Sequence, residues 1–96
     1  MSKYILLLNW TEQGAKNVKD SASRYDAAKE IAKKGGCTLE SVHMTFGAYD
    51  LVIMLDAPND EAAATFNLRV TSAGNIRGVT LKAFPEAEYR RIVAGL

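Results

Sequence analysis

The 96-residue sequence has a single cysteine, a single histidine, two prolines and no long hydrophobic run. One cysteine cannot form an intramolecular disulfide, and together with one histidine it cannot supply the four ligands of a structural zinc site. The apolar run that begins at Tyr4 is too short for a secretory signal or a membrane span. We therefore expect a cytoplasmic protein with no disulfide, no metal centre and no membrane segment.

An excess of charge of either sign is also missing. Twelve Lys and Arg residues stand against eleven Asp and Glu residues, which leaves a net charge of +1 at pH 7. Such a balance gives no electrostatic attraction to nucleic acid or to an anionic membrane, so neither is expected as a partner. With 48% hydrophobic and 24% charged residues, the composition is that of a soluble globular protein. The length predicts one domain over residues 1–96 with one modest core.

Strand-like and helix-like patterns alternate along the chain. Residues 4–10 are almost entirely apolar, which predicts a strand in the middle of a sheet. A 3.6-residue period over about 20–34, followed by Gly35-Gly36, predicts a helix with a glycine cap. Asn59 is a good N-cap for a second helix, which Gly74-Asn75 ends. Further strands are predicted at 37–46, 49–56 and 76–84, and a short helical tail at 86–94.

This order predicts an α+β fold of the ferredoxin-like βαββαβ type. Such a fold has a four-stranded antiparallel sheet with both helices on one face. The other face then has no cover, and we expect Val52, Met54 and Phe84 to make it apolar. An isologous homodimer, in which two chains pack these faces together, would bury that surface.

The two apolar runs that meet at Gly47-Ala48 predict a β-hairpin. A glycine in the first position of a two-residue loop is typical of a type II′ turn, in which Gly47 supplies the positive φ. The turn fixes the pairing, so that His43 faces Val52 and Phe46 faces Tyr49. On this register the core face carries Val42, Met44, Phe46, Tyr49, Leu51, Ile53 and Leu55. The second face carries Ser41, His43, Thr45, Asp50, Val52 and Met54.

The same stretch resembles the naming motif of the GYD-domain family, whose members are placed among the dimeric α+β barrels. The resemblance extends over nearly the whole chain, at Tyr4-Ile5, Trp10-Thr11, Gly14, Lys19-Asp20-Ser21, Arg24, Gly35-Gly36, Gly47-Ala48-Tyr49-Asp50, Ala57-Pro58, Gly74-Asn75, Thr80 and Ala83-Phe84. It implies a ferredoxin-like chain that pairs into a dimeric barrel, and it implies no particular reaction. Structural relatives in that group include monooxygenases, isomerases and ligand-sensing domains, so the fold alone does not assign a function.

His43 and Asp50 are the candidate catalytic residues. On the predicted register they lie on the same face, one diagonal step apart and within roughly 7 to 8 Å at the backbone. A carboxylate at that distance would orient the imidazole as a general base. Thr45 follows in the same row, and Trp10 and Lys82 would join these residues as ligand contacts if their side chains point to the same face. The sequence leaves the facing of Tyr4 and Trp10 open.

Three functions fit this pattern. The leading one is a homodimer that binds a small, partly apolar molecule inside the barrel through His43, Thr45 and Asp50. The second is a small isomerase or cofactor-free oxygenase with His43 as base. The third is a structural or assembly protein, with higher oligomers, in which Asp50 accepts backbone N–H bonds and fixes the hairpin. The sequence contains no phosphate-binding loop, zinc-ligand spacing or nucleophile elbow, so it identifies no cofactor.

Overall fold

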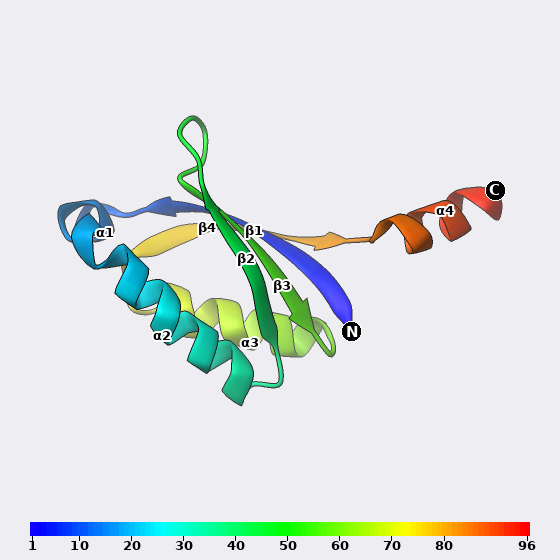
Figure 1. Cartoon of the computed structure of the whole chain (residues 1–96), viewed down its shortest axis with the longest axis horizontal. Helices are drawn as coiled ribbons and strands as arrows, with labels where there is room; N and C mark the ends of the chain where they lie inside the picture. Colours follow the sequence, from blue (N-terminus) through cyan, green and yellow to red (C-terminus); the bar gives the residue numbers. More distant parts are fainter.

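The computed structural model describes residues 1–96 and has the predicted ferredoxin-like fold (Figure 1). The sheet has the strand order β2-β3-β1-β4, and all neighbouring strands are antiparallel. The strands are β1 (Ser2–Trp10), β2 (Thr38–Met44), β3 (Leu51–Ala57) and β4 (Ile76–Ala83). The helices are α1 (Glu12–Lys16), the 3-10 helix η1 (Val18–Asp20), α2 (Ser21–Lys34), α3 (Asp60–Thr71) and α4 (Glu86–Ala94).

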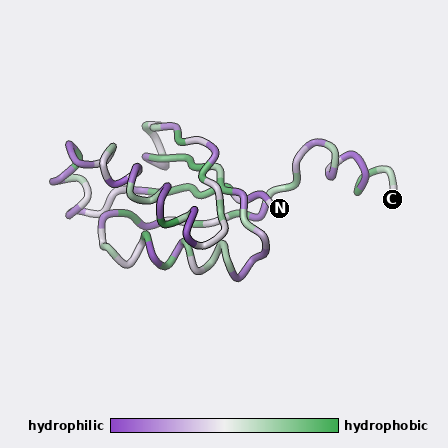
Figure 2. Tube along the Cα trace, turned by 60° about the horizontal axis from the view of Figure 1, so that its bottom comes forward, coloured by the Kyte–Doolittle hydropathy of each residue, from purple (hydrophilic) through white to green (hydrophobic).

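The core lies between the sheet and the helices α2 and α3, which both cover the same face (Figure 1). Alternation along the central strand β1 directs Tyr4, Leu6 and Leu8 toward the helices, and all three are buried. Leu6 lies opposite Ile53 of β3, and Phe66 of α3 is buried in the same cluster. The strands are accordingly the most hydrophobic stretches of the chain in Figure 2.

The opposite face of the sheet has no helix over it, and we call it the open face. Ile5 of β1 lies between Met54 of β3 and Leu81 of β4, and the next row is formed in the same way. The apolar residues of the open face are Ile5, Leu7, Val52, Met54, Val79 and Leu81. The prediction is confirmed for Val52 and Met54 and is wrong for Phe84, which follows the end of β4.

From Ser41 to Met44 the hairpin of β2 and β3 has the predicted register, in which the two residue numbers of each pair add to 95. Its pairs are Ser41 with Met54, Val42 with Ile53, His43 with Val52 and Met44 with Leu51. A β-bulge between Leu39 and Ser41 shifts the register by one residue toward the start of β2. The edge strand therefore bends at this point.

The predicted two-residue turn is wrong. β2 ends at Met44 and β3 begins at Leu51, and residues 45–50 form a longer loop between them. Gly47 has the predicted positive φ, at 151°. At the end of the loop the Asp50 carbonyl accepts from the Thr45 N–H at 2.8 Å and the Asp50 N–H donates to the Leu8 carbonyl at 2.9 Å, so Asp50 is bonded both across the hairpin and to β1.

The predicted core face of the hairpin is buried only at the end far from the loop. Ile53 and Leu55 are buried, whereas Val42, Met44 and Phe46 are exposed. The hairpin end extends beyond α2 and α3 (Figure 1), so these three side chains have no helix to pack against. The end of the hairpin is thus an exposed apolar loop.

A short helix, α1, lies between β1 and α2 and packs against the turn that follows α3. The Thr11 hydroxyl caps α1 by accepting from the Gly14 N–H at 3.1 Å, and it donates to the Gly74 carbonyl at 2.5 Å. Gly14 is buried, and a Cβ at that position would stand 2.0 Å from the Asn75 carbonyl oxygen. Only glycine allows this approach of the two backbones.

The tail helix α4 confirms the predicted helix at 86–94 and extends away from the rest of the molecule (Figures 1 and 2). Its side chains Tyr89, Ile92 and Val93 are each about half exposed. None of the helices has the length and apolar content needed to cross a bilayer.

Candidate functional site

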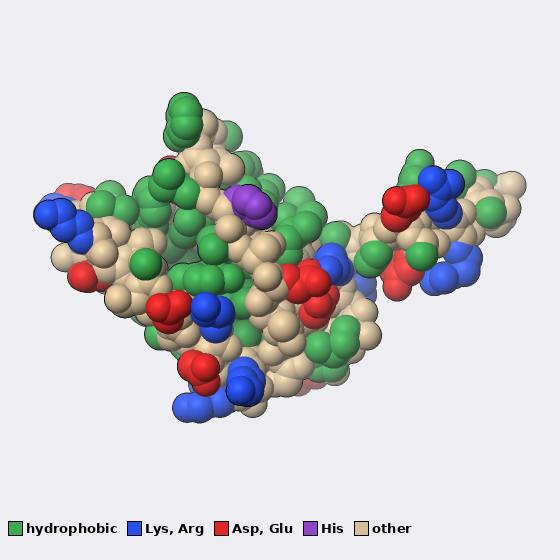
Figure 3. All heavy atoms as spheres, viewed as in Figure 1, with side chains coloured by type: hydrophobic (Ala, Val, Ile, Leu, Met, Phe, Trp, Pro, Cys, Tyr) green, Lys and Arg blue, Asp and Glu red, His purple; other side chains and the backbone are tan.

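His43 lies on β2 on the side of the open face, opposite Val52, and its side chain is exposed. The single histidine appears at the molecular surface in Figure 3, below the apolar hairpin end. Its imidazole forms no hydrogen bond or ion pair within the chain. Both ring nitrogens are therefore available to a ligand or to a second protein.

Asp50 is engaged by the backbone of β1. Its Oδ2 accepts from the Trp10 N–H at 3.0 Å, and no hydrogen bond joins it to His43. Thr45 is engaged within the loop, since its hydroxyl donates to the Tyr49 carbonyl at 2.5 Å. Of the three predicted polar contacts, only His43 has a side chain without a partner. The structural role predicted for Asp50, as an acceptor of backbone N–H bonds, is therefore present.

Trp10 and Lys82 lie on the other side of the sheet from His43. Lys82 is opposite Tyr4, and Trp10 is opposite Ile76, on the face that the helices cover. This settles the facing of β1, where Tyr4 and Trp10 share the helix side. The grouping of Trp10 and Lys82 with His43 is wrong. Trp10 shares the helix side of β1 with Tyr4, and the register of β4 turns Lys82 toward Asp60 of α3.

Lys82 instead belongs to a cluster with Tyr4 and Asp60. The Asp60 carboxylate accepts from the Tyr4 hydroxyl, and Lys82 Nζ stands 2.9 Å from Asp60 Oδ1 and 5.8 Å from the centre of the Tyr4 ring. The Tyr4 hydrogen bond and then the Lys82 ammonium lower the pKa of Asp60. The same hydrogen bond raises the pKa of Tyr4, and the Asp60 carboxylate raises the pKa of Lys82. The cluster joins β1, β4 and the start of α3.

Sequence reasoning missed this cluster. Asp60 is recognisable as an acidic residue in the first turn of a helix, a common place for a carboxylate. Its partners are 22 and 56 residues away along the chain, and only the strand order brings them together.

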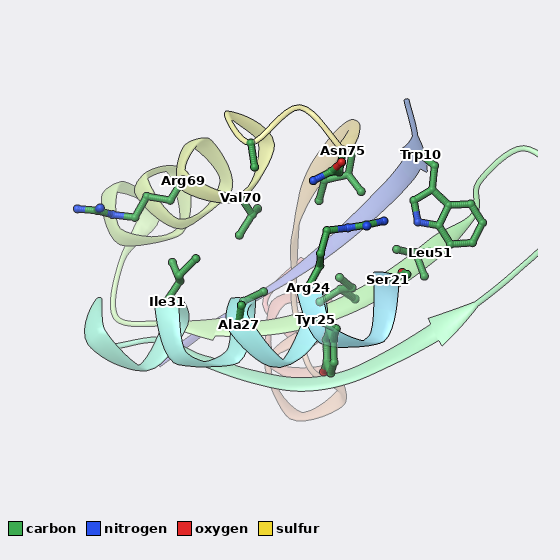
Figure 4. Close-up of a pocket in the computed structure, with 14 residues that line it drawn as sticks. Trp10, Ser21, Arg24, Tyr25, Ala27, Ile31, Leu51, Arg69, Val70 and Asn75 are labelled. Carbon is green, nitrogen blue, oxygen red and sulfur yellow. The ribbon is translucent and has the colours of Figure 1, made fainter. Parts of the chain in front are cut away.

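A pocket opens between α2, α3 and the helix side of the sheet (Figure 4), and we call it the helix-side pocket. Its volume is about 180 Å³, and ten of its fourteen lining residues are hydrophobic. Trp10 forms one wall, and Arg24 of α2 runs across the opening toward the indole (Figure 4). Arg69 of α3 contributes its stem and points its guanidinium away. The sequence predicts Trp10 as a ligand contact and leaves its facing open, and the structure puts it at this pocket on the helix side of the sheet.

At this pocket one N–H donor has no acceptor and one cation has no anionic partner within the chain. The Trp10 Nε1–H is shielded from solvent and has no acceptor. Arg24 donates to the carbonyls of Asn17 at 2.8 Å and Gly14 at 3.5 Å, and it forms no ion pair within the chain. A buried N–H donor normally has an acceptor, so this one marks a place for an incoming group.

Thiol and metal chemistry have little support elsewhere in the chain. Cys37 is buried, and this burial raises the pKa of its thiol, so the thiolate needed for nucleophilic attack is disfavoured. No three His, Cys, Asp or Glu side chains come together as metal ligands would.

Comparison with known proteins identifies the family. The model of the GYD domain matches residues 4–93, from the buried Tyr4 to the tail helix. The chain belongs to the GYD domain family. The resemblance noted at the Gly47-Ala48-Tyr49-Asp50 motif is thereby confirmed.

A curated relative of this GYD domain comes from Thermus thermophilus. It is named a glutamine synthetase and cystathionine beta-lyase binding protein, and it is 26% identical over 89 residues, which cover 92% of this chain and 94% of the relative. A solved structure of a single-residue mutant of Rv3291c matches 88% of the chain with a TM-score of 0.68 and 12% identity. The chain spans about half the length of that protein, and at this identity the likeness concerns the fold alone.

Proposed function

We propose that this GYD-domain protein is a homodimeric interaction protein, in which two chains pack their open faces together and the dimer binds other proteins. The observation that carries the proposal is the open face itself. Six apolar side chains occupy it without a helix above them, and Val79 and Leu81 are 47% and 46% exposed in the single chain. A contiguous apolar surface of this kind is typical of an interface.

The open face suits a second copy of the same chain because its centre carries no charge. Lys3 and Asp56, at one end, form an ion pair of 3.3 Å, and Lys3 also pairs with Glu40. Both carboxylates at this end of the sheet thus already have a cationic partner, Lys3, within the chain. A two-fold axis through the apolar centre would bury the same six side chains from both copies.

Helix α4 supports the same arrangement. Tyr89, Ile92 and Val93 follow each other at helical spacing and form one apolar stripe, while Glu86 and Arg90 pair at 2.7 Å on the helix. A short helix gains most of its stability from packing of its apolar side. The neighbouring chain of a dimer would supply the surface that the stripe lacks.

For binding to other proteins, the support comes from the relative's name and from the hairpin end. Phe46, in the loop between β2 and β3, is 97% exposed, and Met44, the last residue of β2, is 70% exposed. Figure 3 shows hydrophobic side chains at the projecting end of the molecule. Exposed aromatic residues are frequent anchors in protein interfaces. We therefore assign Phe46 as the contact to a partner enzyme, with glutamine synthetase and cystathionine beta-lyase as the first candidates.

The dimer is tested by light scattering on the purified protein during size-exclusion chromatography. Wild type is expected to have the mass of a dimer, and Leu81→Glu the mass of a monomer, because the substitution places a charge among the apolar side chains of the open face. Leu68→Glu is the matched control, since Leu68 is exposed on α3, away from that face. A monomeric wild type, or a Leu81→Glu variant that stays dimeric, would overturn the proposal.

Partner binding is tested separately by biolayer interferometry with purified glutamine synthetase and cystathionine beta-lyase. The wild-type dimer is expected to bind at least one of them, and Phe46→Ala to lose at least about tenfold in affinity while keeping its mass. Leu68→Ala should bind as wild type does. If neither enzyme is bound by a protein shown to be dimeric, the assignment of partners fails and the dimer stands.

A further inference from the structure

The helix-side pocket has the dimensions of a site for one small molecule. Its volume of about 180 Å³ is close to that of apolar cavities of roughly 150 Å³ that admit benzene. Its floor and walls come from apolar side chains of the sheet and both helices, among them Leu51, Val70 and Ile76. A ring or a short branched chain would fill it.

Trp10 and Arg24 both present N–H donors at the opening of the pocket. The Trp10 Nε1–H has no acceptor in the chain, and the Arg24 guanidinium, with five N–H groups, uses only part of its donor capacity on two backbone carbonyls. Arg24 points toward the indole across the opening (Figure 4). The pocket thus combines one cation and one shielded N–H with no anion of the chain to receive them.

We infer that the helix-side pocket binds a small apolar monocarboxylate. Its apolar part lies among Leu51, Val70 and Ile76, and its carboxylate accepts from the Trp10 Nε1–H and pairs with Arg24. A charge-assisted hydrogen bond of this kind is stronger than one between neutral groups. A second carboxylate or a phosphate would meet mainly apolar walls and lose its hydration without compensation.

This site is separate from the proposed dimer interface. The pocket lies on the helix side of the sheet, and the open face lies on the other side. Dimerisation and ligand binding can therefore succeed or fail independently, and the mass measured by light scattering distinguishes the two cases.

The probe is benzoate, and the readout is the indole N–H of Trp10. The chain has one tryptophan, so its ¹⁵N–¹H correlation spectrum contains one indole resonance that reports on this pocket directly. Benzoate is expected to shift this resonance with a dissociation constant of about 1 mM or below. Benzamide, which has the same shape without the charge, should bind at least about tenfold more weakly.

Arg24→Gln is expected to weaken benzoate binding at least about tenfold. Arg69→Gln is the matched control, because Arg69 lines the same pocket but points its charge away (Figure 4), and it should bind as wild type does. The backbone resonances verify that each variant is folded, and if Arg24→Gln does not fold, the benzoate and benzamide comparison on wild type decides. An indole resonance that benzoate leaves unmoved, or equal binding of the two compounds, would overturn the inference.

Discussion

The carboxylate of Asp50 accepts a hydrogen bond from the backbone N–H of Trp10, with Oδ2 3.0 Å from the nitrogen. The backbone of Asp50 makes two more bonds, since its N–H donates to the Leu8 carbonyl at 2.9 Å and its carbonyl accepts from the Thr45 N–H at 2.8 Å. One residue therefore joins the hairpin loop to the end of the central strand. Asp50, the acidic residue of the Gly47-Ala48-Tyr49-Asp50 motif, thus has a structural role.

Asp50→Ala is expected to lower the free energy of unfolding by about 1.5–3 kcal/mol, because it leaves the half-buried N–H of Trp10 without its charged acceptor. Asp50→Asn keeps an acceptor oxygen and should lose less. Urea denaturation monitored by circular dichroism measures both. Asp26→Ala, which removes an exposed carboxylate paired only with Lys29, should change stability by about 0.5 kcal/mol or less. Equal losses for Asp50→Ala and Asp26→Ala would show that the bond to Trp10 contributes little.

The cluster of Tyr4, Asp60 and Lys82 predicts a pH dependence with two limbs. The pKa of Asp60 is lower in the folded chain than its ordinary 3.8, so its contribution is present above that pH and is lost as the pH falls through the folded pKa. The pKa values of Tyr4 and Lys82 are raised above 10.0 and 10.5, so their contributions are present below those values and are lost as the pH rises through the folded pKa values.

Asp60→Asn should lower stability at neutral pH and flatten both limbs in urea titrations between about pH 2 and 11. Glu61→Gln is the control, because Glu61 shares the first turn of α3 with Asp60 but contacts neither Tyr4 nor Lys82. If both variants change the pH profile alike, the pH dependence of stability comes from negative charge at the start of α3 and not from the cluster.

Gly14→Ala is expected to destabilise the fold by about 1–3 kcal/mol or more, because its Cβ would overlap the Asn75 carbonyl oxygen, a backbone atom that cannot turn aside. Thermal unfolding measures the loss. Gly35→Ala has its nearest contact at 3.6 Å and a negative φ, so it should leave stability nearly unchanged. A Gly14→Ala protein as stable as Gly35→Ala would contradict the close packing of α1 on the turn after α3.

His43→Ala separates the remaining roles of the open face. Since the imidazole is exposed and without partners, the substitution should change the free energy of unfolding by about 0.5 kcal/mol or less. The hypothesis of an isomerase or oxygenase requires a turnover that disappears in this variant while fold and dimer persist. Binding of a small molecule at the open face requires a thermal shift that depends on His43. If the protein is an interaction protein, neither turnover nor a thermal shift should depend on His43.

Much of the fold follows from local signals in the sequence. Asn59 was recognisable as a helix cap, and its side chain does accept from the Ala62 N–H at 2.9 Å. The hairpin register was predictable because a short connection limits how two strands can pair. These signals act over a few residues, where the sequence itself determines the geometry.

The errors concern contacts between distant segments. No turn connects β1 to β4, so nothing local fixed the register that turns Lys82 toward Asp60 and places Val79 and Leu81 on the open face. The longer loop at Gly47 was not predicted either, and Asp50 at its end is bonded to Leu8 and Trp10 of β1, which are about forty residues away along the chain. The pocket beside Trp10 depends on how α2 and α3 lie over the sheet, which periodicity alone does not show.

The strand order has a consequence for how the chain reaches this state. The first strand of the sequence is a central strand of the sheet, and its two neighbours, β3 and β4, begin about fifty and seventy-five residues later. During synthesis β1 emerges without either partner, and its ladder with β4 closes only after almost the whole domain has been made. Folding of this domain is therefore dominated by contacts between distant segments, and we expect it to be slow for its size.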